Sequence, residues 1–315
     1  MTTRSPRRDE RKQLPRKTAD QKEGDYRAVW AIGYIDLMGY RRELLATGYK
    51  PSDDEDELHR RYTRVFERRE ILIRPLETYF AELRRRQESR PPDPTRPAMA
   101  QYFRAPDVTV TGFSDSVFLE ASTSPTRATG GMTDNGLAPL NSVVTASIVA
   151  LFTNLKAKSP LRGGLDIGFG VRSRGHLYSA ATVSAVELGE ECAKYPRILV
   201  GPSVVKTIQP MTNGTSPESR IARDIENVLY EDPDDGRLGL DFLGSVSQGL
   251  YASGFKPSDV RDIWLFAHTN RNTFSDSGVQ KEWGYYDRLI RYMEPRLALW
   301  GPPRYWEDPR VRRTG

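Results

Sequence analysis

The sequence is poor in the residues that build disulfide frameworks and soft-metal centres. It has one cysteine, Cys192, and three scattered histidines, His59, His176 and His268. A single cysteine excludes a disulfide framework and any multi-cysteine zinc site. No run of 18 apolar residues is present and the mean hydropathy is −0.61, so we expect no membrane span. The charged N-terminal stretch has no apolar segment behind it, which argues against a secretory signal. These features predict a cytoplasmic protein.

The balance of charge separates a terminal segment from the rest of the chain. The 315 residues are 37% hydrophobic, 28% charged and 10% aromatic, typical of a globular chain with a real core. A net charge of +5 and a pI near 9.2 first indicate a nucleic-acid partner. Residues 1–27, however, carry nine basic and five acidic residues, which leaves a net charge of only +1 for the remainder. We therefore expect no stable nucleic-acid partner.

The pattern along the chain divides it into three parts. Residues 1–25 are polar and lack periodicity, which predicts a disordered basic tail. Residues 26–252 are predicted to form one folded domain. Residues 253–315 are predicted to form a helical extension packed on that core.

Within the folded domain, strand and helix patterns alternate in a definite order. An apolar strand at 28–35 is followed by a long charged helix from 53 to 88, which Pro75 is expected to kink or interrupt. We then expect strands at 108–113 and 117–120, a helix at 140–157, a strand at 161–171, a helix at 179–192, a strand at 198–205 and a turn plus strand at 232–243. This order predicts a mixed α+β fold with an antiparallel hairpin, for which a ferredoxin-like core fits best.

Two aspartates stand where predicted strands end. Asp36 closes the first apolar strand and Asp115 lies at the tip of the hairpin. If the strand lies beside the hairpin, the two carboxylates converge, and a divalent cation is their natural partner. Two ions held in this way can clamp the attacking and leaving oxygens of a phosphoryl displacement. The turn LMGY at 37–40 would offer backbone N–H groups to a triphosphate. The alternative is that both aspartates are ordinary strand-end caps.

Several segments in combination resemble one known family. They are YIDLMGY (34–40), FSDS (113–116), LRGG (161–164), YSAATVSAVELGEECAKYPRI (178–198) and DDGRLGLDFL (234–243). Across residues 28–245 the chain resembles the bacterial pyrimidine nucleotide cyclases of the Pycsar anti-phage system, which are class III nucleotidyl cyclase homologues.

The resemblance implies both an activity and a site. It implies a homodimer with active sites at the interface, converting UTP or CTP to the 3′,5′-cyclic monophosphate and pyrophosphate with Mn²⁺ or Mg²⁺. UTP is slightly favoured, and the diffusible product would be read by a separate effector. In this interpretation Asp36 and Asp115 bind both ions, and the backbone carbonyl of Leu37 adds a ligand to one.

The chain also departs from the family pattern. The helix expected at 179–192 lacks the Asn-x-x-x-Arg pair of purine cyclases, so a transition-state arginine must come from elsewhere. If none does, the chain is a cyclase-like domain that binds a nucleotide without turnover. Thr111 stands where adenylate cyclases carry a lysine, which argues against ATP and does not choose between UTP and CTP. A second alternative is a metal-dependent nuclease or palm-type polymerase. The basic tail favours this hypothesis, and the nearly neutral core argues against it.

Four further residues are candidates for substrate binding. Arg162 could reach the phosphates, the alternative being an ion pair with a carboxylate such as Asp166. Arg104, just before the hairpin, could contact base or phosphate. Tyr26 and Tyr40 flank the first strand and could stack on a base, the alternative being half-buried core tyrosines.

Overall fold

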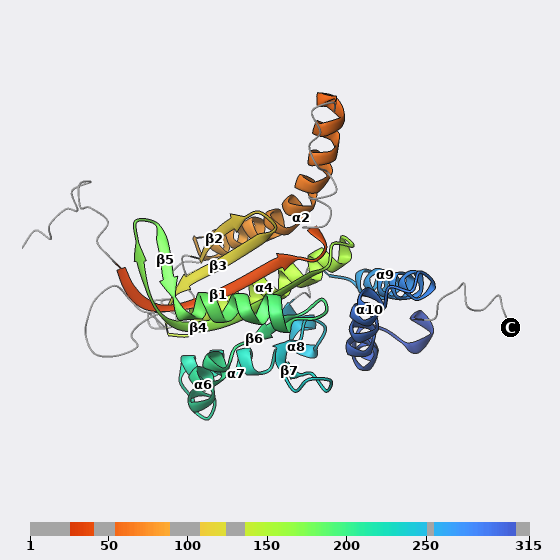
Figure 1. Cartoon of the computed structure of the whole chain (residues 1–315). Helices are drawn as coiled ribbons and strands as arrows, with labels where there is room; N and C mark the ends of the chain where they lie inside the picture. Colours follow the sequence, from red (N-terminus) through yellow and green to blue (C-terminus); the bar gives the residue numbers. More distant parts are fainter. Residues whose placement is uncertain (1–25, 41–53, 89–107, 124–135, 251–254, 307–315) are drawn as a thin grey trace, which may run out of the picture.

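The computed structural model describes residues 26–40, 54–88, 108–123, 136–250 and 255–306, and its centre is one eight-stranded sheet (Figure 1). The strand order is β2-β3-β1-β4-β6-β8-β7, with β5 pairing to β4. The strands are β1 (Tyr26–Leu37), β2 (Val108–Phe113), β3 (Ser116–Ser122), β4 (Leu161–Ser173), β5 (His176–Ser179), β6 (Ile198–Val200), β7 (Leu229–Glu231) and β8 (Leu238–Leu240).

The first half of the chain builds the predicted ferredoxin-like core. In sequence it runs β1, α2 (Glu55–Glu88), β2, β3, α4 (Ala138–Lys156) and β4. The four strands lie in the order β2-β3-β1-β4, and every neighbouring pair is antiparallel. The mixed α+β prediction is therefore confirmed. The central strand β1 is buried from Trp30 to Leu37, which explains its continuous apolar sequence.

Helices cover both faces of this core. Helices α2 and α4 pack on each other over one face, and α5 (Ala180–Glu187) lies over β1 and β4 on the other. Gly164 lets α5 approach β4, because a Cβ there would lie 2.1 Å from the backbone oxygen of Ala185. By length and composition alone α4 could cross a membrane, which the sequence argument had excluded. Its apolar stretch instead fills the core, where 72% of that stretch is buried.

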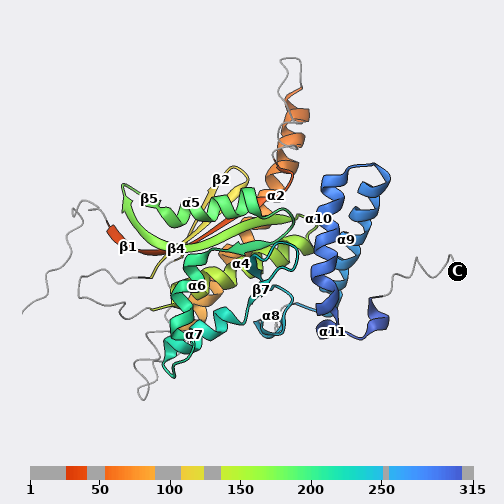
Figure 2. The same ribbon diagram turned by 60° about the horizontal axis from the view of Figure 1, so that its bottom comes forward.

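The C-terminal helices extend the same hydrophobic core. They are α6 (Pro202–Ile208), α7 (Pro217–Glu226), α8 (Ser245–Leu250), α9 (Pro257–Asp276), α10 (Gln280–Met293) and α11 (Leu297–Trp300) (Figure 2). Phe152 of α4 joins the two parts of the core, because its ring centroid lies 4.0 Å from that of Phe255 and 6.1 Å from that of Trp300. The Trp300 indole N–H donates to the Leu243 carbonyl over 2.9 Å.

Two element predictions need correction. The strand expected at 198–205 ends at Val200, because Pro202 occupies the first position of α6, where its fixed φ suits a helix. The helix expected at 179–192 becomes α5 followed by a π-helical turn, η1 (Leu188–Cys192). Of the two outcomes expected at Pro75, interruption does not occur: helix α2 continues through it to Glu88, and the helix is bent along its length (Figure 1). The short strands β5 and β7 and the helices α7 and α8 were not predicted.

Candidate active site

Strand pairing brings Asp36 and Asp115 to one corner of the sheet. In the β1–β3 register Asp36 lies opposite Ser116, the residue after Asp115. The hairpin turn contains Ser114 in a left-handed conformation (φ 55°). It returns the chain so that the Leu37 N–H donates to the Asp115 carbonyl over 3.1 Å. Strand pairing therefore places Asp36 and Asp115 at the same corner of the sheet, where the charge of Asp115 adds to the effect of burial in raising the pKa of Asp36. Their joint role in binding metal ions stays a prediction.

Asp36 is a buried carboxylate with an arginine partner. It is 7% exposed, and its Oδ2 accepts from Arg162 Nε over 2.9 Å. Its Oδ1 lies 3.5 Å from Ser116 Oγ, at the limit of a hydrogen bond. Burial raises the pKa of Asp36 above its usual value; Arg162 opposes this shift, and the charges of Asp115 and Glu190 add to it. Because burial disfavours the ionised form of Asp36, a further positive charge beside it would stabilise that form.

Two residues absent from the sequence-based candidates complete the cluster. The Tyr34 hydroxyl donates to Glu190 Oε1 over 2.8 Å and lies 3.1 Å from Ser116 Oγ. Arg162 Nη1 donates to the backbone carbonyl of Glu190 over 2.9 Å. Tyr34 was detectable, because it stands two residues before Asp36 and shares its face of β1. Glu190 could not be detected from the sequence, because it reaches Tyr34 only through the π-helical turn η1.

A glycine lets η1 approach the strand. A Cβ on Gly189 would lie 2.6 Å from Cδ1 of Tyr34, so a side chain there would push η1 off β1. Burial raises the pKa of Tyr34, with further upward contributions from Asp36 and Glu190, so its hydroxyl stays protonated and donates. Single π-helical turns of this kind are frequent at functional sites.

The turn after β1 does not leave its first N–H groups free for a phosphate. Leu37 N–H is bound to Asp115, and Met38 N–H donates to the Pro160 carbonyl over 3.0 Å. The Met38 carbonyl in turn accepts from Arg68 Nη2 of α2 over 3.1 Å. The expectation that residues 37–40 cradle a triphosphate is therefore wrong for the first two N–H groups, which serve the fold.

Of the predicted substrate-binding residues that the structure describes, only Arg162 is brought to the carboxylate cluster. Arg162 does pair with a carboxylate, but with Asp36 and not Asp166, whose Oδ2 accepts from Ser184 Oγ. Tyr40 is 7% exposed and belongs to the main core, as in the alternative interpretation. Tyr26 begins β1, ten residues from Asp36 and about 33 Å away at 3.3 Å per residue, so the strand does not bring it to the carboxylates. Arg104 lies outside the described residues.

The described residues at this corner offer carboxylates to a divalent cation but do not form a complete ligand set by themselves. Within the described ranges no group of three or more His, Cys, Asp or Glu side chains could hold a metal ion. Mg²⁺ is usually held by one or two carboxylates together with substrate phosphates, and Asp36 and Asp115 would supply the carboxylates. An ion at Asp36 has to compete with Arg162.

Comparisons with known proteins add little. No protein-family model and no curated protein matches the chain. Among solved structures, the adenylyl cyclase CyaB from P. aeruginosa is similar over 59% of this chain and 83% of its own, with 12% identity and a TM-score of 0.32. A likeness at this level carries no conclusion about activity.

Proposed function

We propose that this chain is a nucleotide cyclase that converts a nucleoside triphosphate to its 3′,5′-cyclic monophosphate and pyrophosphate. The observation that carries the proposal is the pair of carboxylates, Asp36 and Asp115, held at one corner of the sheet beside Arg162. From the family resemblance we propose UTP as the substrate, with CTP as the alternative. The cyclic product would serve as a diffusible second messenger in anti-phage defence.

Divalent ions, Mn²⁺ or Mg²⁺, when bound, lower the pKa of the ribose 3′-hydroxyl and neutralise charge on the phosphates. Asp36 and Asp115 would hold them, with the Leu37 carbonyl as a further ligand. The 3′ oxygen forms its bond to the α-phosphorus as the bond to the β-phosphate oxygen breaks, which releases pyrophosphate and one proton. Ser116, within reach of Asp36 and of the Tyr34 hydroxyl, limits the orientations of the Asp36 carboxylate.

Arg162 is our candidate for the missing transition-state arginine. Its side chain is 27% exposed and it already contacts Asp36, so a cation at Asp36 would free its guanidinium for the phosphates. A planar guanidinium binds phosphate oxygens through two parallel hydrogen bonds. This would replace the arginine that the helix at 180–187 lacks.

The assembly and location are proposed on the resemblance alone. We propose a cytoplasmic homodimer with active sites at the interface, whose product is read by a separate effector. Sedimentation analysis measures the first point directly, and a protein that stays monomeric across the micromolar range would contradict it.

The activity test is incubation of the purified protein with each nucleoside triphosphate and Mn²⁺, followed by separation of cyclic products. We expect a cyclic pyrimidine nucleotide, lost in Asp36→Ala and in Asp115→Ala. Asp262→Ala, which removes an exposed carboxylate of α9, is the matched control and should keep full activity. No cyclic product from any nucleotide, or an active Asp36→Ala protein, would overturn the proposal.

A nucleotide-binding domain without turnover is the second candidate, and the Asp36–Arg162 ion pair favours it. That pair already satisfies one oxygen of the carboxylate that a metal would need. Calorimetry that records tight nucleotide binding without pyrophosphate release would support this candidate. Pyrophosphate release by the wild-type protein separates the two candidates, and in an active protein Arg162→Ala should abolish turnover while it strengthens metal binding.

A further inference from the structure

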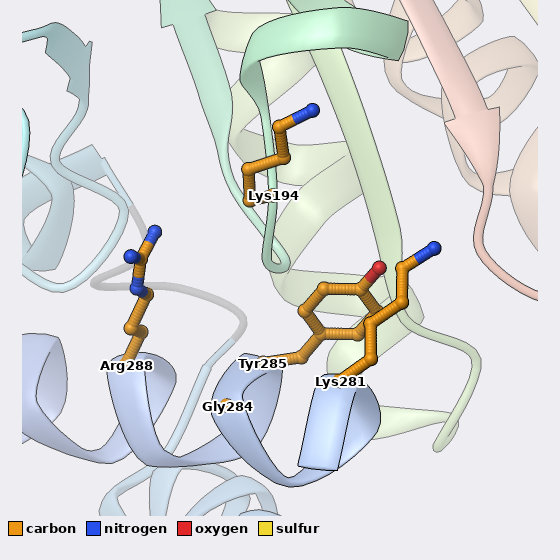
Figure 3. A pocket seen from close by; sticks show the side chains of 5 residues that line it. All are labelled: Lys194, Lys281, Gly284, Tyr285 and Arg288. Atoms are coloured by element: carbon orange, nitrogen blue, oxygen red, sulfur yellow. The ribbon is translucent and has the colours of Figure 1, made fainter. Parts of the chain in front are cut away.

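A basic pocket lies between α10 and the segment that joins η1 to β6 (Figure 3). It is lined by Lys194, Lys281, Gly284, Tyr285 and Arg288 and has a volume of about 270 Å³. Lys281, Tyr285 and Arg288 are spaced four and three residues apart, so they rise from one face of α10. Lys194 comes from the opposite wall.

The lining carries three positive charges and no carboxylate. Arg288 has an acidic partner in Asp234, whose Oδ2 lies 3.5 Å from Arg288 Nε. Asp234 is shared, because its Oδ1 accepts from Arg291 over 2.8 Å. Within the described part of the chain, no ion pair joins Lys194 or Lys281 to an acidic side chain. The pocket therefore has a surplus of positive charge and, in Tyr285, a hydroxyl group.

Space and charge together define the ligand. A cavity of this size is just below the range of about 300–1,000 Å³ that takes a whole drug-sized molecule. Figure 3 shows the charged groups of Lys194, Lys281 and Arg288 spread around the Tyr285 ring and not side by side. An anion that contacts two of them therefore needs several charged oxygens along an extended chain, and phosphate oxygens accept from both ammonium and guanidinium groups. The floor stays open at Gly284, where an added Cβ would meet no atom within 4 Å.

We propose that this pocket is a polyphosphate-binding site that takes inorganic pyrophosphate or the phosphate chain of a nucleotide. It shares no residue with the carboxylate cluster at Asp36, and it does not depend on the proposed cyclase activity. The two sites are connected through η1, since Glu190 belongs to that cluster and Lys194 follows four residues later. A phosphate anion here therefore sits against the segment that positions Glu190 beside Tyr34.

The test is calorimetric titration of the full-length protein with sodium pyrophosphate, in EDTA and at constant ionic strength. The variant Lys194→Gln/Lys281→Gln removes two exposed charges from opposite walls and should weaken binding about tenfold or more. The variant Lys206→Gln/Arg220→Gln removes the same charge from α6 and α7, away from α10, and should bind as the wild type does (Figure 2). Thermal-shift measurements on the same proteins report binding even where the heat is small.

Two further variants test the space itself. Gly284→Leu should fill the pocket and abolish binding, whereas Gly284→Ala should retain it. Asp36→Ala should bind pyrophosphate normally, so a failed cyclase assay and a failed pocket remain distinguishable. Competition by UTP in that protein would identify a nucleotide chain as occupant, and lack of competition a free anion. The proposal is overturned if pyrophosphate at millimolar concentration neither binds nor shifts the melting temperature, or if the double lysine variant and Gly284→Leu bind like the wild type.

Discussion

Arg197 is the most deeply buried charged side chain among the described residues, and its removal should destabilise the fold strongly. Its side chain is 1% exposed. Nη1 donates to Asp232 Oδ2 over 2.5 Å, Nη2 donates to Asp235 Oδ2 over 2.5 Å, and Nη2 also donates to the Cys192 carbonyl over 3.1 Å. The guanidinium thus ties η1 to the turn between β7 and β8. The perturbation is Arg197→Met, which keeps an apolar stem of similar length and removes every donor.

The magnitude follows from what the substitution leaves behind. The Asp232 side chain is 5% exposed and would lose its cationic partner. Breaking a buried ion pair by removing one partner costs about 3–5 kcal/mol. At about 2–4 °C per kcal/mol for a domain of this size, the melting temperature should fall by about 6–20 °C.

The assay is thermal and urea unfolding of Arg197→Met beside Arg237→Met. Arg237 belongs to the same turn, but its side chain is 48% exposed and its Nε lies 4.0 Å from Asp235, so its loss should cost about 1 kcal/mol or less. If Arg197→Met loses less than about 1 kcal/mol, or no more than Arg237→Met, the account of the buried network is refuted.

The same network sets a pH dependence. Burial tends to raise the pKa of Asp235, but the Arg197 hydrogen bond outweighs it and the pKa is lowered. A carboxylate with a lowered folded-state pKa stabilises the fold above its unfolded pKa, about 3.9, and this stabilisation is lost as the pH falls through the folded value. Unfolding measured from pH 5 down to pH 2 should show this loss in the wild type and less of it in Arg197→Met. Equal slopes would contradict the assignment.

Three further predictions concern the core, α10 and the carboxylate site. Phe152→Ala should destabilise by about 3–5 kcal/mol in urea unfolding, whereas Phe66→Ala, at a side chain 54% exposed, should change stability by less than about 0.5 kcal/mol; similar losses would contradict the shared core. Gly284→Ala should stabilise α10 by about 1 kcal/mol, since the added methyl meets open space; a lower melting temperature would show otherwise. Asp36 has a raised pKa, so its ionisation disfavours folding increasingly as the pH rises above about 4. The stability of Asp36→Asn relative to wild type should therefore improve between pH 4 and pH 7, and a difference that does not vary with pH would refute this.

Local pattern was enough for the elements whose own residues specify them. The apolar run at 28–35 predicted β1, because a strand buried on both faces must be apolar throughout. The spacing of apolar residues at 140–157 predicted α4, and the FSDS turn predicted the hairpin. The prediction was wrong where a helix-start signal was overlooked. Pro202 was included in a strand, although a proline at that position begins a helix.

The sequence by itself determined the order of elements, the ferredoxin-like core and the two aspartates that end strands, since these depend on periodicity and turn chemistry within short segments. Only the tertiary structure decided what surrounds those aspartates. The pairing of β1 with β4 sets Arg162 against Asp36, and the π-helical turn η1 brings Glu190 to Tyr34 across 156 positions of sequence. The basic pocket likewise joins Lys194 to α10. Such contacts depend on strand register and helix packing, which no local pattern encodes.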